Sequence, residues 1–285
     1  MKTVLSGIRP TGNLHLGNYY GAMVNFLKMQ EENKCYFFIA DWHSLTTHPD
    51  PKMLHVNVGN ILSEYLACGL NPEKSTIYIQ SDVPEIAELY LLLNMQAYLG
   101  ELEKTVSFKE KARQNPDNVN AGLLTYPVLM ATDILIHNAD YVPVGKDQEQ
   151  HLEMTRNYAN RFNHKYGVDY FKLPTAYNYG HELIKIPGLD GSGKMGKSEG
   201  NCIYLIDEPK VIEKKVKGAL TDNGPEGENT PKPEYIENLF TILKVVSTPE
   251  VVDFYDNLWN TGQPKYRNRD KYLTALSASF KLSIT

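Results

Sequence analysis

Short apolar runs alternate with longer stretches of helical periodicity along the first 80 residues. The runs at 3–5, 35–41 and 75–80 are rich in apolar and β-branched residues, which predicts buried strands. Residues 22–29 and 54–66 instead repeat apolar positions at helical spacing. Strands that alternate with helices predict a parallel, doubly wound α/β sheet. Ligands bind such a sheet at the carboxyl ends of its strands.

The pattern then changes to helices. Three helical segments predict a helical insertion at about residues 82–138, and they cover residues 84–98, 100–111 and 122–137. Turn-forming residues at 113–118 predict a loop between the second and the third. Residues 140–145 predict a further short strand with its turn, and residues 146–162 predict the helix that follows.

The composition shifts after Asn201. Three helices are predicted at residues 209–217, 235–246 and 249–259, and a loop rich in Gly, Pro and Glu separates the first from the second. We therefore predict two domains, an α/β domain over residues 1–203 and a helical domain over residues 204–285.

Composition and charge narrow the class of protein. A hydrophobic content of 42% and a charged content of 22% are typical of a soluble globular protein. The formal net charge of −5 argues against diffuse coating of nucleic acid, although a local basic surface stays possible. Cys35, Cys68 and Cys202 are far apart, which predicts a reducing compartment and no zinc site. With neither a signal peptide nor a membrane span in the pattern, we expect a cytoplasmic protein.

A glycine-rich segment at residues 6–21 follows the first predicted strand and leads into a helix. This arrangement turns backbone N–H groups and a helix dipole toward an anionic ligand. Gly17 and Gly21 lie one helical turn apart, so a flat purine could lie against the backbone there. The spacing differs from a dinucleotide fingerprint. By itself, the sequence His15-Leu16-Gly17-Asn18 also fits an ordinary turn with a hydrogen-bonded histidine.

A second glycine-rich segment covers residues 184–198 and predicts a mobile loop. Lys194, Lys197 and Ser198 can donate hydrogen bonds to phosphate oxygens. Gly188 and Gly193-Lys194 have the spacing of a P-loop, but Met195 stands where a P-loop needs Ser or Thr for Mg²⁺. A P-loop nucleotidase therefore remains a minor alternative, beside a solvated loop that happens to carry two lysines.

Together, the two segments resemble the HIGH and KMSKS signatures of class I aminoacyl-tRNA synthetases. The intervening residues 100–103, 121–127, 130–135 and 142–148 look like the bacterial type of tryptophanyl-tRNA synthetase, and the resemblance runs to about residue 260. It implies a Rossmann-like catalytic domain with a helical insertion, followed by a helical region that binds the tRNA anticodon. The implied activity is that of an ATP-dependent ligase. It converts L-tryptophan and ATP to tryptophanyl-adenylate and pyrophosphate, and then transfers tryptophan to tRNA(Trp). The resemblance also implies a homodimer that does not bind membranes.

The resemblance assigns residues to ATP and to catalysis. The ATP-binding residues would be Arg9, Pro10, Thr11, Gly17, Asn18, Gly145, Lys146, Asp147, Ile186, Lys194, Met195, Gly196, Lys197 and Ser198. The catalytic residues would be His15, Asn18, Lys194, Lys197 and Ser198, with help from Lys111. Mg²⁺ is expected to bind through the phosphates of ATP, without a metal site of the protein itself.

The resemblance also assigns a tryptophan pocket. Asp133 would accept the indole N–H, and Tyr126 and Gln148 would hold the α-ammonium, with His43 and Gln80 nearby. The walls of the pocket would be Leu5, Met130, Ile134, Val142 and Val144. The substrate carboxylate is the nucleophile in this reaction, so the site must supply positioning and stabilisation of negative charge rather than a nucleophilic side chain.

The chain departs from the family pattern at three places. Gly196 replaces a serine, and Ser107 stands where relatives often carry a longer polar side chain. From Tyr266 onward the sequence lacks family character, which predicts a truncated or altered C-terminus and puts the anticodon-reading part in doubt. Two alternatives remain open, namely a tyrosine-specific relative and a binding protein of the same fold that has lost catalysis.

Overall fold

The computed structural model describes residues 1–145, 148–177 and 185–262, which gather into two compact units. The sheet unit comprises residues 1–12 and the described residues between 26 and 177. The loop unit comprises residues 13–25 and the described residues from 185 onward. The boundary at residue 203 between an α/β domain and a helical domain stays a prediction.

The sheet unit is built on five parallel strands in the order β3-β2-β1-β4-β5. The strands are β1 (Thr3–Ile8), β2 (Lys34–Ile39), β3 (Ser75–Ile79), β4 (Tyr141–Val142) and β5 (Thr175–Ala176). The parallel, doubly wound sheet is thus confirmed. β4 is shorter than the predicted segment, and β5 was not predicted, because two residues are too few to show a period.

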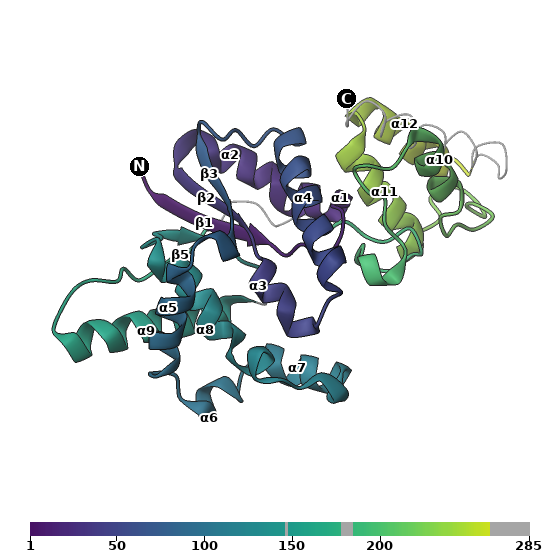
Figure 1. Cartoon of the computed structure of the whole chain (residues 1–285). Helices are drawn as coiled ribbons and strands as arrows, with labels where there is room; N and C mark the ends of the chain where they lie inside the picture. The colour runs from purple at the N-terminus through teal and green to yellow at the C-terminus, as the bar shows by residue number, and fades with distance from the viewer. Residues whose placement is uncertain (146–147, 178–184, 263–285) are drawn as a thin grey trace. The chain divides into compact units, whose positions relative to one another are not determined.

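Helices cover both faces of this sheet (Figure 1). Phe37 of β2 stacks on Phe26, with ring centroids 4.5 Å apart, and Tyr65 packs edge-on against the same ring. The next residue of β2, Phe38, points to the opposite face and joins an apolar cluster with Ile134. The helices involved are α2 (Val24–Glu32) and α4 (Pro51–Ala67) on the first face, and α8 (Ala121–Ile136) and α9 (Glu149–Tyr166) on the second.

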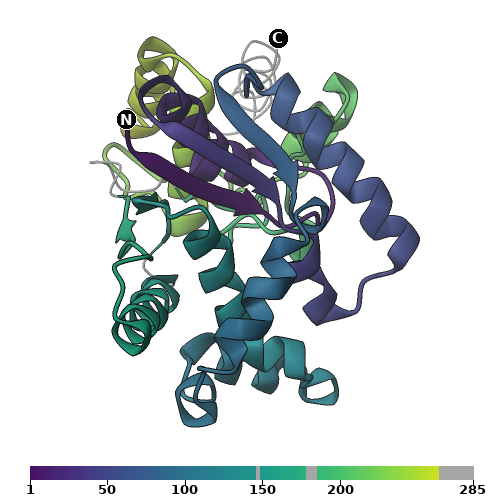
Figure 2. The ribbon, with the colours of Figure 1, turned by 60° about the vertical axis from the view of Figure 1, so that its left-hand side comes forward.

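The described chain between β3 and β4 is helical, as predicted. It contains η3 (Gln80–Asp82), α5 (Glu85–Asn94), α6 (Leu99–Leu102), α7 (Val106–Gln114), η4 (Pro116–Asn118) and α8. Helix α5 lies along α8 in Figure 2, and α8 also packs against α9. The helix expected over residues 100–111 is divided in two, because Thr105 bonds back to the Leu102 carbonyl at 2.8 Å and ends α6. Two short elements, α3 (Asp41–Ser44) and η2 (Leu45–Thr47), follow β2.

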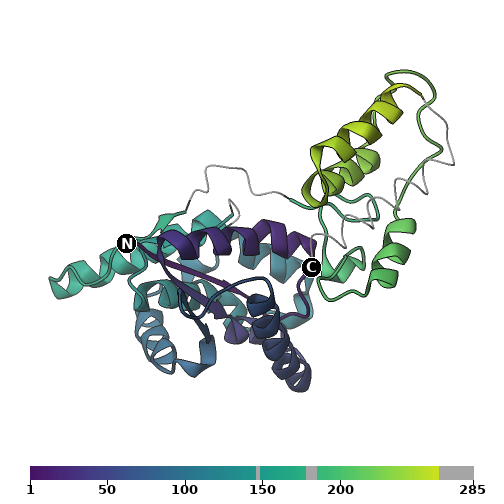
Figure 3. The same cartoon turned by 90° about the horizontal axis from the view of Figure 1, so that it is seen from above.

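The loop unit begins with α1 (Leu16–Asn18) and the π-helical turn η1 (Tyr19–Met23). It continues with η6 (Lys197–Glu199), α10 (Pro209–Lys217), α11 (Glu234–Val246) and α12 (Pro249–Asn260). The last three confirm the predicted helices to within a residue, and α11 and α12 lie side by side in Figure 3. No helix in the described ranges is long and apolar enough to cross a membrane. The unusual sequence from Tyr266 onward lies outside the described residues.

Candidate active site

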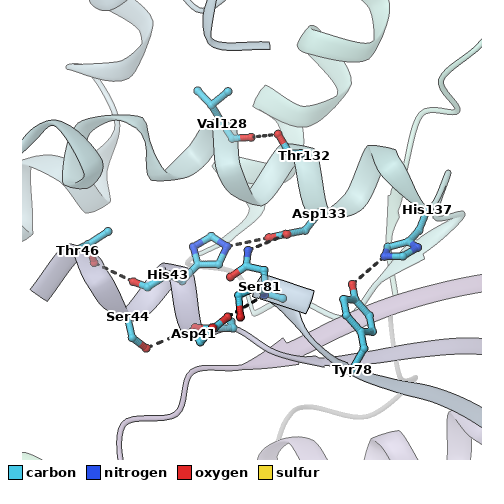
Figure 4. A network of polar contacts seen from close by, with 12 residues as sticks. Asp41, His43, Ser44, Thr46, Tyr78, Ser81, Val128, Thr132, Asp133 and His137 are labelled. Atoms are coloured by element: carbon cyan, nitrogen blue, oxygen red, sulfur yellow. Dashed lines mark hydrogen bonds and ion pairs between the residues drawn. The ribbon is translucent and has the colours of Figure 1, made fainter. Parts of the chain in front are cut away.

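A buried carboxylate forms the centre of the sheet unit's polar network. Asp133 of α8 is 1% exposed. Its Oδ1 accepts a hydrogen bond from Gln80 Nε2 at 2.8 Å, and its Oδ2 lies 2.8 Å from His43 Nε2 (Figure 4). His43 and Gln80 both follow strands, so the sheet edge brings them together as predicted. Burial raises the pKa of Asp133, and the bonds from His43 and Gln80 oppose that rise by favouring the carboxylate.

Apolar side chains surround this network. All five residues predicted to wall an indole ring belong to one cluster with Phe38, Ala40 and Leu152, namely Leu5, Met130, Ile134, Val142 and Val144. Gln80 is fully buried, and its Oε1 has no hydrogen-bond partner among the described residues. A carboxylate held as an acceptor beside apolar surface suits a flat apolar ring that carries one N–H donor.

A second polar network joins the residues predicted to hold an α-ammonium. The Tyr126 hydroxyl lies 2.8 Å from His151 Nε2, and His151 Nδ1 lies 2.9 Å from Gln148 Oε1. His151 is 1% exposed and was missed at the level of sequence. The only available signal was its position three residues after Gln148, on the same face of α9. The rings of Tyr126 and His43 are 6.4 Å apart, so the two networks are neighbours.

Two cations of the sheet unit lie close to the second network. Lys111 Nζ sits 4.4 Å from the centre of the Tyr126 ring. Burial, and then the charge of Arg9, lower the pKa of Lys111. Arg9 is exposed and Lys111 is half-buried. Two like charges close enough to lower a pKa favour an anion beside them, which agrees with the predicted ATP-binding roles of both residues. Pro10, Thr11 and Gly145 follow strands, whereas Lys146 and Asp147 lie outside the described residues.

The first signature, His15–Asn18, is fixed inside the loop unit. The Leu16 N–H donates to the Ile203 carbonyl at 3.1 Å, and the Leu205 N–H donates to the Leu14 carbonyl at 2.9 Å. Asn18 Oδ1 accepts the His15 backbone N–H at 3.1 Å. These bonds hold the first signature against the segment that follows the second signature, so the loop unit contains both.

The His15 side chain is buried, with only 7% of it exposed. Burial, followed by the charges of Lys197 and Lys194, lowers the pKa of His15 to about 4. The imidazole is therefore neutral at physiological pH and suits hydrogen bonding to a phosphate oxygen rather than proton transfer. A Cβ on Gly17 would lie 2.8 Å from His15 Cε1, so the glycine makes room for this ring. Stacking of a purine on Gly17 and Gly21 stays a prediction.

The second signature, Lys194–Ser198, lies on a loop organised by Asn201. Asn201 Oδ1 accepts the Gly196 N–H at 2.9 Å, while its Nδ2 contacts Asp190 Oδ1 at 3.0 Å and Ser192 Oγ at 2.9 Å. Met195 N–H donates to the Ile186 carbonyl at 2.8 Å, and both side chains are buried in the apolar core of the loop unit. Contact of these two residues with ATP stays a prediction, as does mobility of the loop.

The polar side chains of the second signature point outward from this frame. Lys194 and Ser198 are exposed, and Lys197 is half-buried at the start of η6. Gly196 has an extended backbone with φ of −144°, and a Cβ there would lie 3.4 Å from Glu199 Cγ. A serine would therefore fit with a small shift of Glu199, and the backbone conformation does not require glycine.

Comparisons with known proteins agree with this geometry. The pattern of the family described as tRNA synthetases class I (W and Y) matches residues 1–270. A tryptophan–tRNA ligase of Porphyromonas gingivalis is 62% identical over 284 residues, which cover all of this chain and 87% of the relative. A tryptophan–tRNA ligase of Fusobacterium nucleatum is 49% identical over 225 residues, which cover 79% of this chain and 68% of the relative.

A solved structure also resembles this chain in its fold. Tryptophanyl-tRNA synthetase of Campylobacter jejuni, complexed with ADP and tryptophan, is 36% identical with a TM-score of 0.86. The match covers 98% of this chain and 86% of that one. Fold and sequence therefore point to the same group of proteins.

Proposed function

The chain belongs to the tRNA synthetases class I (W and Y), and on this premise we propose that it joins L-tryptophan to tRNA(Trp) with ATP. The observation that carries the choice of amino acid is Asp133, a buried acceptor on α8, the helix that also supplies Met130 and Ile134 to the apolar cluster of the sheet unit. Family membership leaves no place for the P-loop nucleotidase. The relatives named tryptophan–tRNA ligases favour tryptophan over tyrosine.

Binding of the amino acid falls to the sheet unit. Asp133 accepts the indole N–H while His43 and Gln80 keep its carboxylate oriented. Tyr126 and Gln148 accept hydrogen bonds from the α-ammonium, and the substrate carboxylate, which is ionised at neutral pH, is left to act as the nucleophile. Orientation of that carboxylate is the main contribution of this unit to the rate.

Stabilisation of the phosphates falls to the loop unit. The substrate carboxylate attacks the α-phosphorus, the bond to the bridging oxygen breaks, and pyrophosphate leaves. Negative charge grows on the phosphate oxygens during this step, and Lys194, Lys197 and Ser198 donate to them together with neutral His15. Within the sheet unit, Arg9 and Lys111 are two further cations that can contact a phosphate. Mg²⁺ would bind through ATP phosphates, with the protein supplying these donors.

The second step transfers the aminoacyl group from the adenylate to the terminal adenosine of tRNA. The helices α10 to α12 are then the region that contacts the anticodon. Lysines cluster on α10 and include Lys210, Lys214, Lys215 and Lys217, which would supply the local basic surface. Cys35, Cys68 and Cys202 are all free thiols, which supports work in the reducing cytoplasm.

A homodimer would explain an exposed apolar surface at the end of α5. Leu91, Leu92, Met95, Tyr98 and Leu99 are each between 57% and 75% exposed, and they follow one another within nine residues. Such a patch favours a protein partner, and a second copy of the chain is the occupant that we propose. Light scattering should give the mass of a dimer, and Leu92→Asp should shift it toward the monomer.

Tryptophan-dependent exchange of pyrophosphate into ATP tests the proposed function. We expect exchange that requires tryptophan and that tyrosine or phenylalanine does not support at equal concentration. Exchange with tyrosine instead would support the tyrosine-specific alternative. No exchange with any amino acid, together with retained binding of tryptophan, would support the binding protein without catalysis.

A further inference from the structure

The ring of His151 connects three helices inside the sheet unit. Its Nε2 lies 2.8 Å from the Tyr126 hydroxyl of α8 and 2.9 Å from Ser107 Oγ of α7. Its Nδ1 lies 2.9 Å from Gln148 Oε1 at the start of α9. With 1% of its surface exposed, His151 has little access to a ligand itself, so any role in binding must act through these neighbours.

The protons of this network follow from the chemistry of its members. An amide oxygen carries no hydrogen, so the contact with Gln148 Oε1 requires the proton of a neutral His151 on Nδ1. Nε2 is then an acceptor. The Tyr126 hydroxyl donates to Ser107 Oγ at 2.7 Å, and the Ser107 hydroxyl can donate onward to Nε2. Hydrogens thus run from Tyr126 through Ser107 to the ring, and from the ring to Gln148.

This order of donors has a consequence for a cation. The Tyr126 proton is given to Ser107, so the tyrosine oxygen can act only as an acceptor toward any other donor. Gln148 Oε1 has two lone pairs and can accept from His151 and from a ligand N–H together. Two oriented oxygens are the partners that an ammonium group needs, and neither requires a buried negative charge.

We propose that His151 is a positioning residue that sets Tyr126 and Gln148 as acceptors for the α-ammonium of the substrate amino acid. The proposal rests on the proposed function and adds the device by which the site distinguishes α-amino acids from other indole compounds. Ser107, which departs from the family pattern, takes part because its short side chain completes the path between Tyr126 and Nε2.

Paired ligands test this role in the full chain. L-Tryptophan carries the α-ammonium, and indole-3-propionate has the same ring and carboxylate without it. His151→Phe keeps a ring of similar size and removes both nitrogens. We expect its Kd for tryptophan, measured by calorimetry, to rise about 10- to 100-fold, as for loss of hydrogen bonds to a charged group. The Kd for indole-3-propionate should change less than about 2-fold. His164→Phe, on the exposed surface of the same helix, is the matched control and should change neither value.

Two conservative variants test the two ring nitrogens of His151 separately. His151→Asn keeps a polar group near Nδ1 for Gln148, and His151→Gln keeps one near Nε2 for Tyr126 and Ser107. Each should recover part of the tryptophan affinity that His151→Phe loses. If His151→Phe does not fold, the Kd for tryptophan compared with the Kd for indole-3-propionate in these two variants tests the positioning role instead. Equal weakening of both ligands, or no weakening of tryptophan, would overturn the proposal. Failure of the proposed function looks different, because the unsubstituted chain would then bind neither ligand, and the positioning role would fall with it.

Discussion

The proposed tryptophan pocket and the second signature are built in opposite ways. In the pocket, Asp133 is buried and both its carboxylate oxygens already have partners from the chain. In the second signature, Asn201 fixes the backbone while Lys194 and Ser198 extend into solvent. A buried charge without hydrogen-bond partners is costly. A carboxylate that recognises an apolar ring must therefore have partners in the protein before the ring binds. Exposed lysines are solvated and have no such cost, so they can be in place before the phosphates bind.

The largest effect should come from the pocket. In Asp133→Asn, one carboxylate oxygen becomes an NH₂ group, which cannot accept the indole N–H. Sites that demand such a bond reject analogues lacking it by about 10⁴-fold, so we expect the preference for tryptophan over phenylalanine to fall by about 10³-fold or more. The measurement is kcat/KM for both amino acids in pyrophosphate exchange.

Asp140→Asn is the matched control for this variant. Asp140 is half-buried and pairs with Lys2 and Lys172 rather than with the pocket. It should keep the wild-type preference even if stability falls. A preference that survives in Asp133→Asn would show that the apolar walls alone select the ring.

Lys197→Ala should lower the rate of adenylate formation by about 10²-fold, as for loss of one preorganised donor to a developing oxyanion. Tryptophan affinity without ATP should stay unchanged, because the residues proposed to bind tryptophan all belong to the sheet unit and Lys197 belongs to the loop unit. Single-turnover rates and tryptophan Kd values separate the two quantities. The control is Lys210→Ala on α10, which should keep the wild-type rate. Weaker tryptophan binding in Lys197→Ala would contradict the proposal that the second signature acts on the phosphates alone.

Much of the fold and several residues of the proposed site could be predicted from the sequence. The strands β1 to β3 could be predicted from short apolar runs, and the helices α10 to α12 from their helical periodicity. Parallel topology then brought His43 and Gln80, which follow strands, to one edge of the sheet. The residues that organise each region were harder to predict. His151 and Asn201 act through contacts made only after folding, and neither belongs to a recognisable motif at the level of sequence.

The grouping of residues 13–25 with the chain beyond residue 185 was equally out of reach. It depends on backbone pairing of Leu14 and Leu16 with Leu205 and Ile203, nearly 190 residues away, and no local pattern announces such a pairing. The two-residue strands β4 and β5 were unpredictable in extent for the same reason, since their bonds come from tertiary partners.

A smaller effect, about 10-fold on kcat, should follow Gly17→Ala. The added Cβ would lie 2.8 Å from His15 Cε1, so the ring must move away from the position set by the first signature. Gly59→Ala in α4 is the matched control, because no atom lies within 4 Å of its added Cβ. The control should keep its activity and gain up to about 1 kcal/mol in stability. An unchanged kcat in Gly17→Ala would mean that the place of the His15 ring does not limit the rate.

The pH dependence of stability should show one neutral histidine in each compact unit, namely buried His15 in the loop unit and half-buried His137 in the sheet unit. Burial is the main cause that lowers the pKa values of His15 and His137 to about 4, from 6.5 in the unfolded chain. The unfolded chain therefore binds more protons between these values, and stability should fall as the pH drops from about 6.5 to 4. Urea midpoints between pH 8 and pH 4.5 measure this slope.

His137→Gln should reduce that slope, whereas the exposed-site control His164→Gln should not. Tyr78 bonds to His137 Nε2 at 2.7 Å, and a glutamine can replace that contact. Equal slopes in His137→Gln and the wild type would show that His137 does not contribute to the acid sensitivity.

The smallest effect should come from Gly196→Ser, which gives the second signature the serine that the resemblance to KMSKS predicts. The backbone there is extended and the new Cβ meets only Glu199 Cγ at 3.4 Å, so folding and tryptophan affinity should not change. The Gly196 N–H already bonds to Asn201, which means that the loop has its main anchor without the serine. We therefore expect the rate of adenylate formation to rise by no more than about 2-fold, since an exposed hydroxyl adds one weak donor beside two lysines. A rise of 10-fold or more in single-turnover experiments would show that this loop is limited by a missing donor, and that it is less complete than its hydrogen bonds indicate.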